Sequence, residues 1–550
     1  MMNANLENEK ISKQLPLFCL MLFSFFLIYF IPQIGITDFR WNKESLYTAI
    51  SIEMNFSHPV TVAHGELISE TYPLFPMLVA LLIKLMVPVS SAARIISVIF
   101  ILATTIAIWV TAKRAFNIQA AFVSSSVFFS SVIIVDKGME GLPETLAFFW
   151  LFLAWGTWFT LGIQRSLWNA AWLLSFTFCG LSFYTIGWEA LFYFFLPLIF
   201  LRRPLSIWSR LNKFGFYTGI SVLAFFVIIW SYPRWIEGQD IPFRNIANEF
   251  SSGYLRQILF FPFDFFLRTS PWILIIWPVF CAEYDEIERN PVFSRYLKTI
   301  FFTLFFINWF LPDNDPRKFS LMMIPLSILS GSRYKILTRR YSLKLNSFII
   351  YLFRILLILS VFFFIFYISP QSIIKRLSNS EKILLLHLNF WKIAIIQIII
   401  SLMICIYVER MYSLKKLPVF KALLLLSTAT MLLFWAVNAP YRAQNNEQRK
   451  WAAEIKRVIG DDFHGDIVIY ETKEVPGDFY GVINYLGCKA RRLQKGLSDI
   501  PKNESTIFLI SSDIPVMPER IWTKKITFNV KKRDVFLWEG VSIKKIPPPK

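Results

Sequence analysis

The sequence predicts an α-helical polytopic membrane protein, with about 13 transmembrane helices followed by a small α/β domain. Three observations lead to this fold class. Apolar residues make up 55% of the chain and charged residues only 17%. Apolar runs of roughly 20 residues, the length that a helix needs to cross a bilayer, recur along it. After Asn438 the composition becomes mixed and charged. Helices are expected rather than barrel strands because the runs lack alternation of apolar and polar residues.

Fourteen apolar runs divide the first 440 residues, and all but one are predicted to cross the membrane. The first follows Lys10 and Lys13 and lacks a small-residue cleavage site, which is typical of a retained signal anchor. The second is short and contains Lys84, so we expect it to lie along the outer interface. The runs cover approximately residues 15–36, 73–89, 91–112, 118–135, 142–163, 167–187, 188–201, 215–232, 271–284, 297–312, 319–332, 347–368, 391–408 and 419–438.

This arrangement places the basic clusters of the chain on the cytoplasmic side, as the positive-inside rule requires. The clusters are Lys113 with Arg114, Arg202 with Arg203, and residues 333–344. The N-terminus then lies inside, and the C-terminal tail lies outside. The formal net charge of +20 resides mostly in such loops, so it indicates membrane topology and not a nucleic-acid-binding surface.

The same topology brings acidic residues together at the outer ends of several helices. These acids are Asp136, Glu140, Glu144 and Glu189, and the stretch DNDPRK lies on the same side. An ionisable group at a membrane boundary costs free energy to desolvate, so it usually has a partner or a task. Their convergence predicts an outward-facing active site or, less specifically, the vestibule of a transporter.

The polar segment 37–76, which follows the first apolar run, carries further candidates. Its acids include Asp38 and Glu44, and His64 and Glu70 lie in the same outer loop. Imidazole and carboxylate groups can ligate a divalent cation. No fixed ligand spacing is present, so the sequence identifies no definite cofactor and leaves a divalent cation open, with His64 and Glu70 as candidate ligands.

The C-terminal part of the chain has the pattern of a small soluble domain. It contains strand-like stretches at DIVIYE, TIFLISS and DVFLWEG and a helical stretch at Asn446–Val458. We therefore expect a membrane domain at residues 1–440, with an outer loop at 37–90 that contains juxtamembrane helices, and an α/β domain at 441–550. Cys488 is the only cysteine outside the apolar runs, so no disulfide within this domain is predicted.

An ordered series of motifs resembles the GT-C membrane glycosyltransferases, in particular the branch of lipid A aminoarabinose transferases and protein O-mannosyltransferase-like enzymes. The motifs are RWNKESLYTAISIEM, ETYPLFPMLVALL, GLPETLAFF, GLSFYTIGWEALFYFFLPLIFLRR, RKFSLMMIP and GDFYGVINYLGCKARRLQKGLSDI. They cover nearly the whole chain. The resemblance implies a multi-pass enzyme of the bacterial inner membrane. It would move a sugar from a polyprenyl-phosphate donor to a lipid, glycan or protein acceptor on the outer face.

Two positions depart from the family pattern. Lys43 stands where the family often has the Asp of an Asp-Glu pair, although Glu44 remains. Thr71 stands where aminoarabinose transferases have a Lys, which leaves the donor phosphate short of one cation. Arg94, Arg317 or Lys318 would have to supply that charge. These departures concern the particular sugar and acceptor more than the fold.

The expected reaction needs a general base for the acceptor hydroxyl and cations for the leaving phosphate. The candidate acids are Glu44, Glu144, Asp38 and Asp136; we expect Glu44 to be the base, and Glu44 and Glu144 to face one site. The candidate cations for the donor phosphate are Arg317, Lys318 and Arg94. Arg317 and Lys318 lie on the outer side, against the positive-inside bias, which favours an anionic partner.

The alternative function is a membrane transporter or flippase for a lipid-linked or small solute. Many transporters contain internal repeats with broken helices, and the two halves of this chain show no such repeat. The long first outer loop and the soluble tail favour the enzyme. Membrane lipids are expected to surround the helices, and no nucleic acid is expected as a partner.

Overall fold

The structure is a computed structural model that describes residues 34, 39 and 41–543, apart from the short ranges named next. These ranges are 57–59, 69–70, 203, 237–253, 285–287, 312–314, 370–390, 415–418, 445–446, 460–467, 473–474, 476–478, 495, 502–503, 505 and 531–532. Two candidate residues, Asp38 and Glu70, and nearly all of the first apolar run lie outside the described residues.

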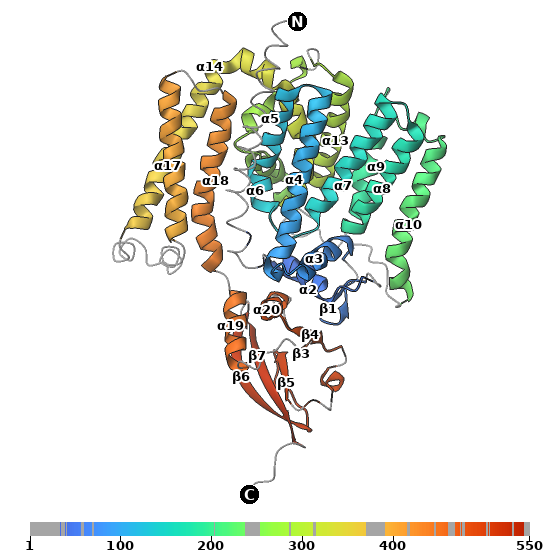
Figure 1. The fold of residues 1–550 in the computed structure, drawn as a ribbon, viewed down its shortest axis with the longest axis vertical. Coiled ribbons are helices and arrows are strands. Elements are labelled where there is room, and N and C mark those ends of the chain that lie inside the picture. The colour runs from blue at the N-terminus through green and yellow to red at the C-terminus, as the bar shows by residue number, and fades with distance from the viewer. Residues whose placement is uncertain are drawn as a thin grey trace.

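Long apolar helices run side by side and form the body of the molecule (Figure 1). By length and composition, six described helices are able to cross a membrane, or seven if one bent pair forms a single span. This confirms a polytopic helical membrane protein, and the number of candidate spans is smaller than the thirteen that the sequence predicts. The main helices are α4 (Val89–Ala115), α7 (Glu144–Thr157) with a π-helical continuation η1 (Trp158–Gln164), α8 (Trp168–Ile186), α9 (Trp188–Ile199), α10 (Phe214–Ile236), α13 (Pro291–Phe310), α17 (Trp391–Ser413) and α18 (Val419–Gln444).

Three of the predicted apolar runs differ from simple spans. Runs 319–332 and 347–368 both lie in α14 (Phe319–Ile368), whose two helical parts meet at a kink at Tyr341, where φ is −126° and ψ is 21°. The basic stretch between these runs lacks proline and is rich in good helix formers, so it is helical on both sides of the kink. Run 118–135 divides into two helices, α5 (Ile118–Phe129) and α6 (Val132–Lys137).

Run 271–284 is not a straight helix either. It contains α12 (Ile273–Ile276) and two short 3-10 turns, η4 (Trp277–Phe280) and η5 (Ala282–Tyr284). Together with α11 (Tyr254–Arg268) it forms a pair bent by 104°. Pro271 and Pro278 lie at the breaks, where a proline removes a backbone donor and ends regular helix.

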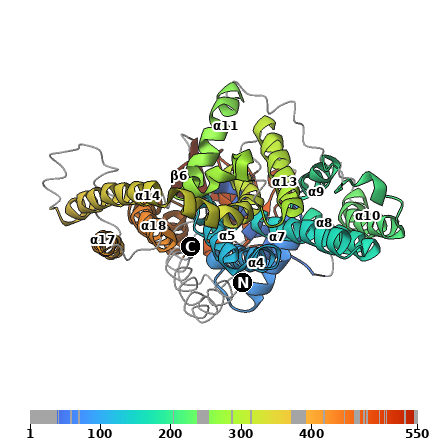
Figure 2. The same ribbon diagram turned by 90° about the horizontal axis from the view of Figure 1, so that it is seen from above.

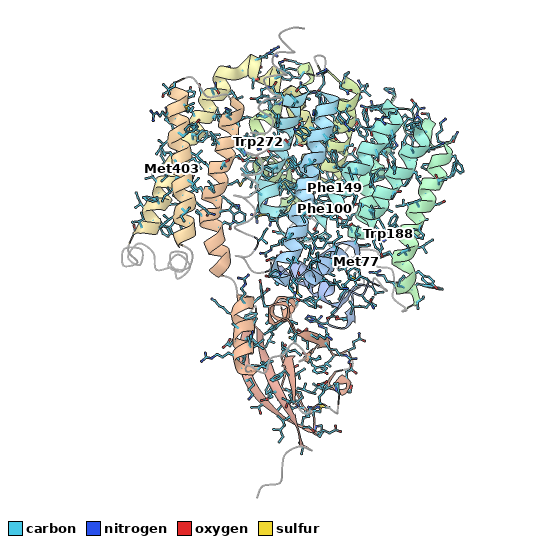
Figure 3. All side chains as sticks on the ribbon, in the orientation of Figure 1. Met77, Phe100, Phe149, Trp188, Trp272 and Met403 are labelled. Atoms are coloured by element: carbon cyan, nitrogen blue, oxygen red, sulfur yellow. The ribbon has the colours of Figure 1, made fainter. Side chains whose placement is uncertain are left out.

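Aromatic side chains fill the centre of the bundle. Trp158 stacks on Tyr296, with ring centroids 5.8 Å apart, and the Tyr296 hydroxyl donates to the Trp155 carbonyl at 3.0 Å. Figure 3 shows Phe100 and Phe149 close together on α4 and α7, where their ring centroids are 5.4 Å apart. These contacts join α4, α7, η1 and α13 at the centre of the bundle.

Two groups of helices flank this centre (Figure 2). On one side lie α17, α18 and part of α14, and on the other lie α8, α9 and α10. Large apolar side chains on these outer helices are exposed, among them Met403 on α17 (Figure 3). Exposed apolar surface of this kind suits contact with lipid. The 3-10 turn η2 (Trp208–Arg210) precedes α10.

The first loop lies at one end of the bundle, between the long helices and the C-terminal sheet (Figure 1). Its elements are α2 (Trp41–Glu53), the short hairpin of β1 (Val62–Ala63) and β2 (Glu66–Leu67), and α3 (Leu74–Lys84). At 1.5 Å per residue α3 is only about 16 Å long, which is too short to cross a bilayer. We call this end of the bundle the loop end.

The C-terminal region, here residues 447–543, forms a five-stranded mixed sheet with strand order β4-β3-β5-β7-β6. Strand β3 pairs in parallel with β4 and β5, and β7 pairs antiparallel with β5 and β6. The three expected strands and the expected helix are present, and this confirms the α/β prediction. The elements are α19 (Glu447–Ile459), β3 (Val468–Glu471), α20 (Phe479–Leu486), β4 (Lys489–Arg492), η7 (Leu497–Asp499), β5 (Thr506–Ser511), β6 (Arg520–Val530) and β7 (Arg533–Ser542).

Candidate functional site

Charged residues of both signs gather at the loop end of the bundle. They come from α2, α4, α6, the turn before α7, the starts of α7 and α9, and the 3-10 turn η6 (Pro316–Lys318) with the residue before it, which leads into α14. We call this set the boundary cluster. Its members are Glu44, Arg94, Asp136, Lys137, Glu140, Glu144, Glu189, Asp315, Arg317 and Lys318.

Glu44 and Arg94 form a buried ion pair at the centre of the loop end. The Arg94 Nε and Nη2 atoms donate to the two Glu44 carboxylate oxygens, at 2.8 Å and 3.1 Å. The Gly141 backbone N–H also donates to Glu44 Oε1, at 2.9 Å. Two-pronged pairing between an arginine and a carboxylate is strong and fixes orientation. The pair therefore ties α2 to α4 and to the turn before α7.

Gly141 is required for this close approach. A Cβ atom at this position would lie 2.6 Å from the Ala93 Cβ atom and 3.0 Å from Glu44 Oε1. The first of these distances is shorter than any real contact between such atoms. The turn therefore reaches the Glu44 carboxylate only because position 141 carries no side chain.

Arg317 lies among three carboxylates. Its Nε atom donates to Asp315 Oδ1 at 2.8 Å, its Nη1 atom lies 3.3 Å from Glu144 Oε1, and its Nε atom lies 3.8 Å from Glu140 Oε2. Burial lowers the pKa of Arg317, but the charges of Glu144, Asp315 and Glu140 outweigh it and raise the pKa. The guanidinium is therefore charged in the folded protein.

Glu144 differs from Glu44 in how its carboxylate is used. It is the first residue of α7, where the helix dipole favours a negative charge. One oxygen faces Arg317, and the other, Oε2, is buried with no hydrogen-bond partner among the described residues. Glu144 therefore keeps an unused acceptor atom.

Lys318 and Glu189 form the more open edge of the cluster. The Lys318 Nζ atom lies 3.3 Å from Glu189 Oε1, and the Glu189 side chain is 38% exposed. Gly187, which precedes α9, has a φ of 76° and packs against the Tyr72 ring. Burial raises the pKa of Tyr72 to about 12, so this phenol stays neutral. The α8–α9 turn thus lies at the loop end, and Figure 3 shows Trp188 and Met77 near it.

Several predicted site residues meet in this cluster although they are far apart in the sequence. Glu44 binds the Gly141 backbone, the neighbouring Glu140 faces Arg317, and Arg317 faces Glu144. Asp136 is close to Lys137, with 3.9 Å between the charged atoms. The roles of these residues in a reaction remain predictions.

Sequence reasoning placed Glu189 and the stretch that contains Asp315 on the outer side without giving either a role, and it did not single out Lys137. Lys137 donates to Glu140 at 3.0 Å, and Asp315 receives the Arg317 backbone N–H at 3.1 Å. The available signal was their position beside helix ends on the same side as the predicted acids. That signal does not tell which acid pairs with which cation.

The candidate metal ligand His64 has a different neighbour. Its Nδ1 atom lies 2.9 Å from Glu471 Oε2, in the C-terminal region. Within the described residues, no group of three or more His, Cys, Asp or Glu side chains is arranged to hold a metal ion.

Comparison with known proteins identifies the fold. No family model matches the sequence, and no curated protein matches it significantly. The fold is similar to ArnT from Cupriavidus metallidurans bound to undecaprenyl phosphate, with a TM-score of 0.69, 12% identity and coverage of 98% of this chain and 100% of ArnT.

The same ArnT in the apo state gives a TM-score of 0.69 at 13% identity, and covers 96% of this chain and 98% of ArnT. An apo oligosaccharyltransferase from Archaeoglobus fulgidus gives a TM-score of 0.41 at 10% identity, with coverage of 88% of this chain and 68% of that enzyme. The ArnT match confirms the predicted GT-C fold over nearly the entire length.

Proposed function

We propose that this chain, which has the GT-C fold of ArnT, is a membrane glycosyltransferase. It moves a sugar from a polyprenyl-phosphate donor to a lipid, glycan or protein acceptor on the outer face of the cytoplasmic membrane. The observation that carries the proposal is the boundary cluster: buried acids and cations converge at one end of a bundle whose structural relative binds undecaprenyl phosphate. The membrane domain comprises residues 1–440, and an extracytoplasmic domain comprises residues 441–550.

Charge at the two ends of the bundle supports an outward-facing site. Helix α4 begins beside α3 at the loop end and extends about 40 Å, so Lys113 and Arg114 in its last turn lie at the opposite end. Helix α9 begins at the loop end and leads to Arg202, and α14 begins there and leads to the basic stretch 333–344. Excess positive charge marks the cytoplasmic side, so the loop end faces outward.

The donor phosphate is held by Arg317 and Lys318 in this proposal. Both lie at the start of α14, and Lys318 faces the more open edge of the cluster at Glu189. The donor phosphate would take the place of a carboxylate beside these two cations and accept charge-assisted hydrogen bonds from them. These bonds strengthen as negative charge develops on the leaving phosphate. Arg94 has a weaker claim, because its guanidinium is engaged by Glu44 and by the Ile34 carbonyl at 3.3 Å.

The base that accepts the proton of the acceptor hydroxyl is Glu144 in this proposal. Its Oε2 atom has an unused lone pair, whereas both Glu44 oxygens already accept hydrogen bonds. A general base needs a free acceptor within hydrogen-bond reach of the hydroxyl. Glu44 then positions α2 and the turn before α7, and Asp136 is the second candidate for the base.

Label transfer by purified protein tests the function. Wild-type protein in lipid nanodiscs receives a panel of radiolabelled undecaprenyl-phosphate sugars together with envelope lipids, glycans and proteins. We expect label to enter one acceptor fraction and undecaprenyl phosphate to be released. A transporter would instead move labelled donor across proteoliposome membranes without forming a glycosidic bond. Movement of labelled donor, with no transfer from any donor that binds, would refute the proposal that the protein is a glycosyltransferase.

A further inference from the structure

The tip of the β1–β2 hairpin is fixed to the end of α2. His64 and Gly65 form the turn, both with positive φ, as in the two-residue turns that suit hairpins. Their backbone N–H groups donate to the Glu53 carboxylate, at 2.8 Å and 3.1 Å. Glu53 is the last residue of α2. Movement of the hairpin tip therefore moves the C-terminal end of α2.

The C-terminal region receives this hairpin tip at the carboxyl ends of β3 and β4. Glu471, the last residue of β3, is fully buried against the His64 ring at 2.9 Å. Arg492, the last residue of β4, donates its backbone N–H to the His64 carbonyl at 2.7 Å. The Arg492 side chain lies 3.4 Å from Glu66 and 3.8 Å from Glu471. The hairpin thus occupies an edge at which open α/β sheets commonly bind ligands.

A second contact holds the N-terminal end of α2. The Asn484 side chain, on α20, donates to the Ser45 carbonyl at 2.8 Å, and both residues are buried. Ser45 follows Glu44 directly. Tyr480, also on α20, belongs to the same buried apolar cluster as Ala49 of α2, and its ring centroid lies 4.6 Å from that of His64. The C-terminal region therefore contacts α2 at both ends.

We propose that Glu471 and Asn484 are positioning residues for sugar transfer, because they fix α2 and, through it, Glu44 and its contact with the turn that precedes Glu144. The inference rests on the proposed function. Its specific content is that the C-terminal region acts on the transfer step and not on donor binding. The contacts of Arg317 and Lys318 described above come from Glu140 in the turn before α7, from α7 and α9, and from Asp315 before η6, and none of these comes from the C-terminal region.

Full-length variants in nanodiscs test the proposal by two readouts. Glu471→Ala and Asn484→Ala remove the contacts, and Lys525→Ala removes an ion pair of the same region, with Glu539 at 2.7 Å, that does not touch α2. We expect hydrogen exchange in α2 to accelerate about 10-fold in Glu471→Ala and Asn484→Ala, because each loses one buried hydrogen bond. Exchange in α2 should stay unchanged in Lys525→Ala. Transfer should fall in parallel, while the Kd for undecaprenyl phosphate stays within about 2-fold.

Conservative variants separate positioning from loss of folding. Glu471→Gln keeps an acceptor for His64 and should retain most of the transfer. Asn484→Asp keeps the shape but cannot donate to Ser45, so it should behave like Asn484→Ala. Exchange in β5–β7 reports whether the sheet is intact. Two outcomes would overturn the proposal if the sheet is intact. One is unchanged exchange in α2, and the other is an equal loss of transfer and of undecaprenyl-phosphate affinity. Absence of transfer by wild type would refute the enzyme, while exchange in α2 would still decide whether the contacts position the helix.

Discussion

At the scale of single residues, burial and pairing separate two glutamates that look alike in the sequence. Glu44 is fully buried and both of its oxygens are occupied, whereas Glu144 is 21% exposed and keeps an unused oxygen. A carboxylate held by an arginine on both oxygens is suited to fixing structure. A carboxylate with a spare lone pair is suited to accepting a proton.

Replacing the proposed base should stop chemistry but not binding. Glu144→Gln keeps the side-chain shape and loses the proton acceptor, so transfer should fall by about 100-fold to 10,000-fold. Binding of undecaprenyl phosphate, measured by equilibrium binding in nanodiscs, should change little. Asp136→Asn is the matched control and should retain transfer. The reverse pattern, with transfer lost only in Asp136→Asn, would make Asp136 the base.

Replacing the positioning glutamate should affect stability as well as transfer. Glu44→Gln leaves the Arg94 guanidinium buried without its counter-charge, which costs about 3 kcal/mol for a broken buried pair. The thermal unfolding midpoint should therefore fall. In Glu44→Gln with Arg94→Leu the midpoint should recover, because no unpaired charge remains, while transfer stays low. A Glu44→Gln protein as stable as wild type but inactive would point to Glu44 as the base.

The proposed phosphate ligands should affect donor binding itself. Replacing both Arg317 and Lys318 by Ala removes two positive charges from the site, so both the affinity for undecaprenyl phosphate and the transfer rate should fall by about 10-fold or more. Arg340→Ala is the control, because Arg340 lies on the basic stretch of α14 and pairs with the exposed Glu283. Unchanged affinity in the double variant would remove these residues from the phosphate site.

At the scale of elements, the sequence predicted the helices and strands that have a local pattern of apolar and polar residues. The apolar helices, the strands β3, β5 and β7, and the helix α19 follow directly from composition and periodicity. Strand β6 was missed because Lys524 and Lys525 interrupt its apolar pattern, and charged side chains of this kind are common on edge strands. The helical conformation of the basic stretch in α14 was missed because a basic stretch between apolar runs predicts a loop, whereas here it is helical on both sides of a kink at Tyr341.

The turn before α7 provides a test at this scale. Gly141→Ala introduces a Cβ atom where Ala93 and the Glu44 carboxylate leave no room, so the turn must move away from Glu44. We expect transfer to fall by about 10-fold or more, since an ångström-scale misplacement has effects of this size. Gly156→Ala on α7 is the control, because its Cβ would meet no atom within 4 Å. Equal activity in the two variants would show that the turn does not position the site.

At the scale of the whole molecule, the sequence placed the candidate acids on one side of the membrane but could not pair them. Which carboxylate meets Arg94, Arg317 or His64 depends on how α2, α4, α7 and η6 pack, and packing between distant segments leaves no local pattern. The partner of His64 shows this limit clearly. Its neighbours in the loop suggested a metal site, whereas its contact is Glu471, about 400 residues away in the chain.

The contact between the C-terminal region and the first loop should weaken in acid. Burial raises the pKa of Glu471, but the charge and hydrogen bond of His64 and the charge of Arg492 outweigh it, so the net pKa is lowered. A carboxyl group whose pKa is lower in the folded protein stabilises the contact at pH values above its unfolded pKa of about 4.3. This stabilisation is lost as the pH falls through the folded pKa. Glu53, Glu66 and Tyr480 also face this site.

Hydrogen exchange in α2 at several pH values measures this effect. Wild-type exchange, corrected for its intrinsic pH dependence, should accelerate as the pH falls below about 4.3, and Glu471→Gln should show a flatter profile. The Lys525→Ala variant should follow wild type. A Glu471→Gln profile that matches wild type would assign the acid sensitivity to another carboxylate.

Under the proposed function, the contact of Glu471 and Asn484 with α2 also determines when a newly made protein can become active. Helix α2 leaves the ribosome about 400 residues before its partners in β3 and α20. A nascent chain that has inserted all its membrane helices still lacks the residues that fix α2. Synthesis must pass α20 and the C-terminal region must fold before that helix is held. Under the proposed function, the order of synthesis keeps the protein inactive while its helices are still being inserted, and a chain truncated before β3 would lack the contacts that fix α2.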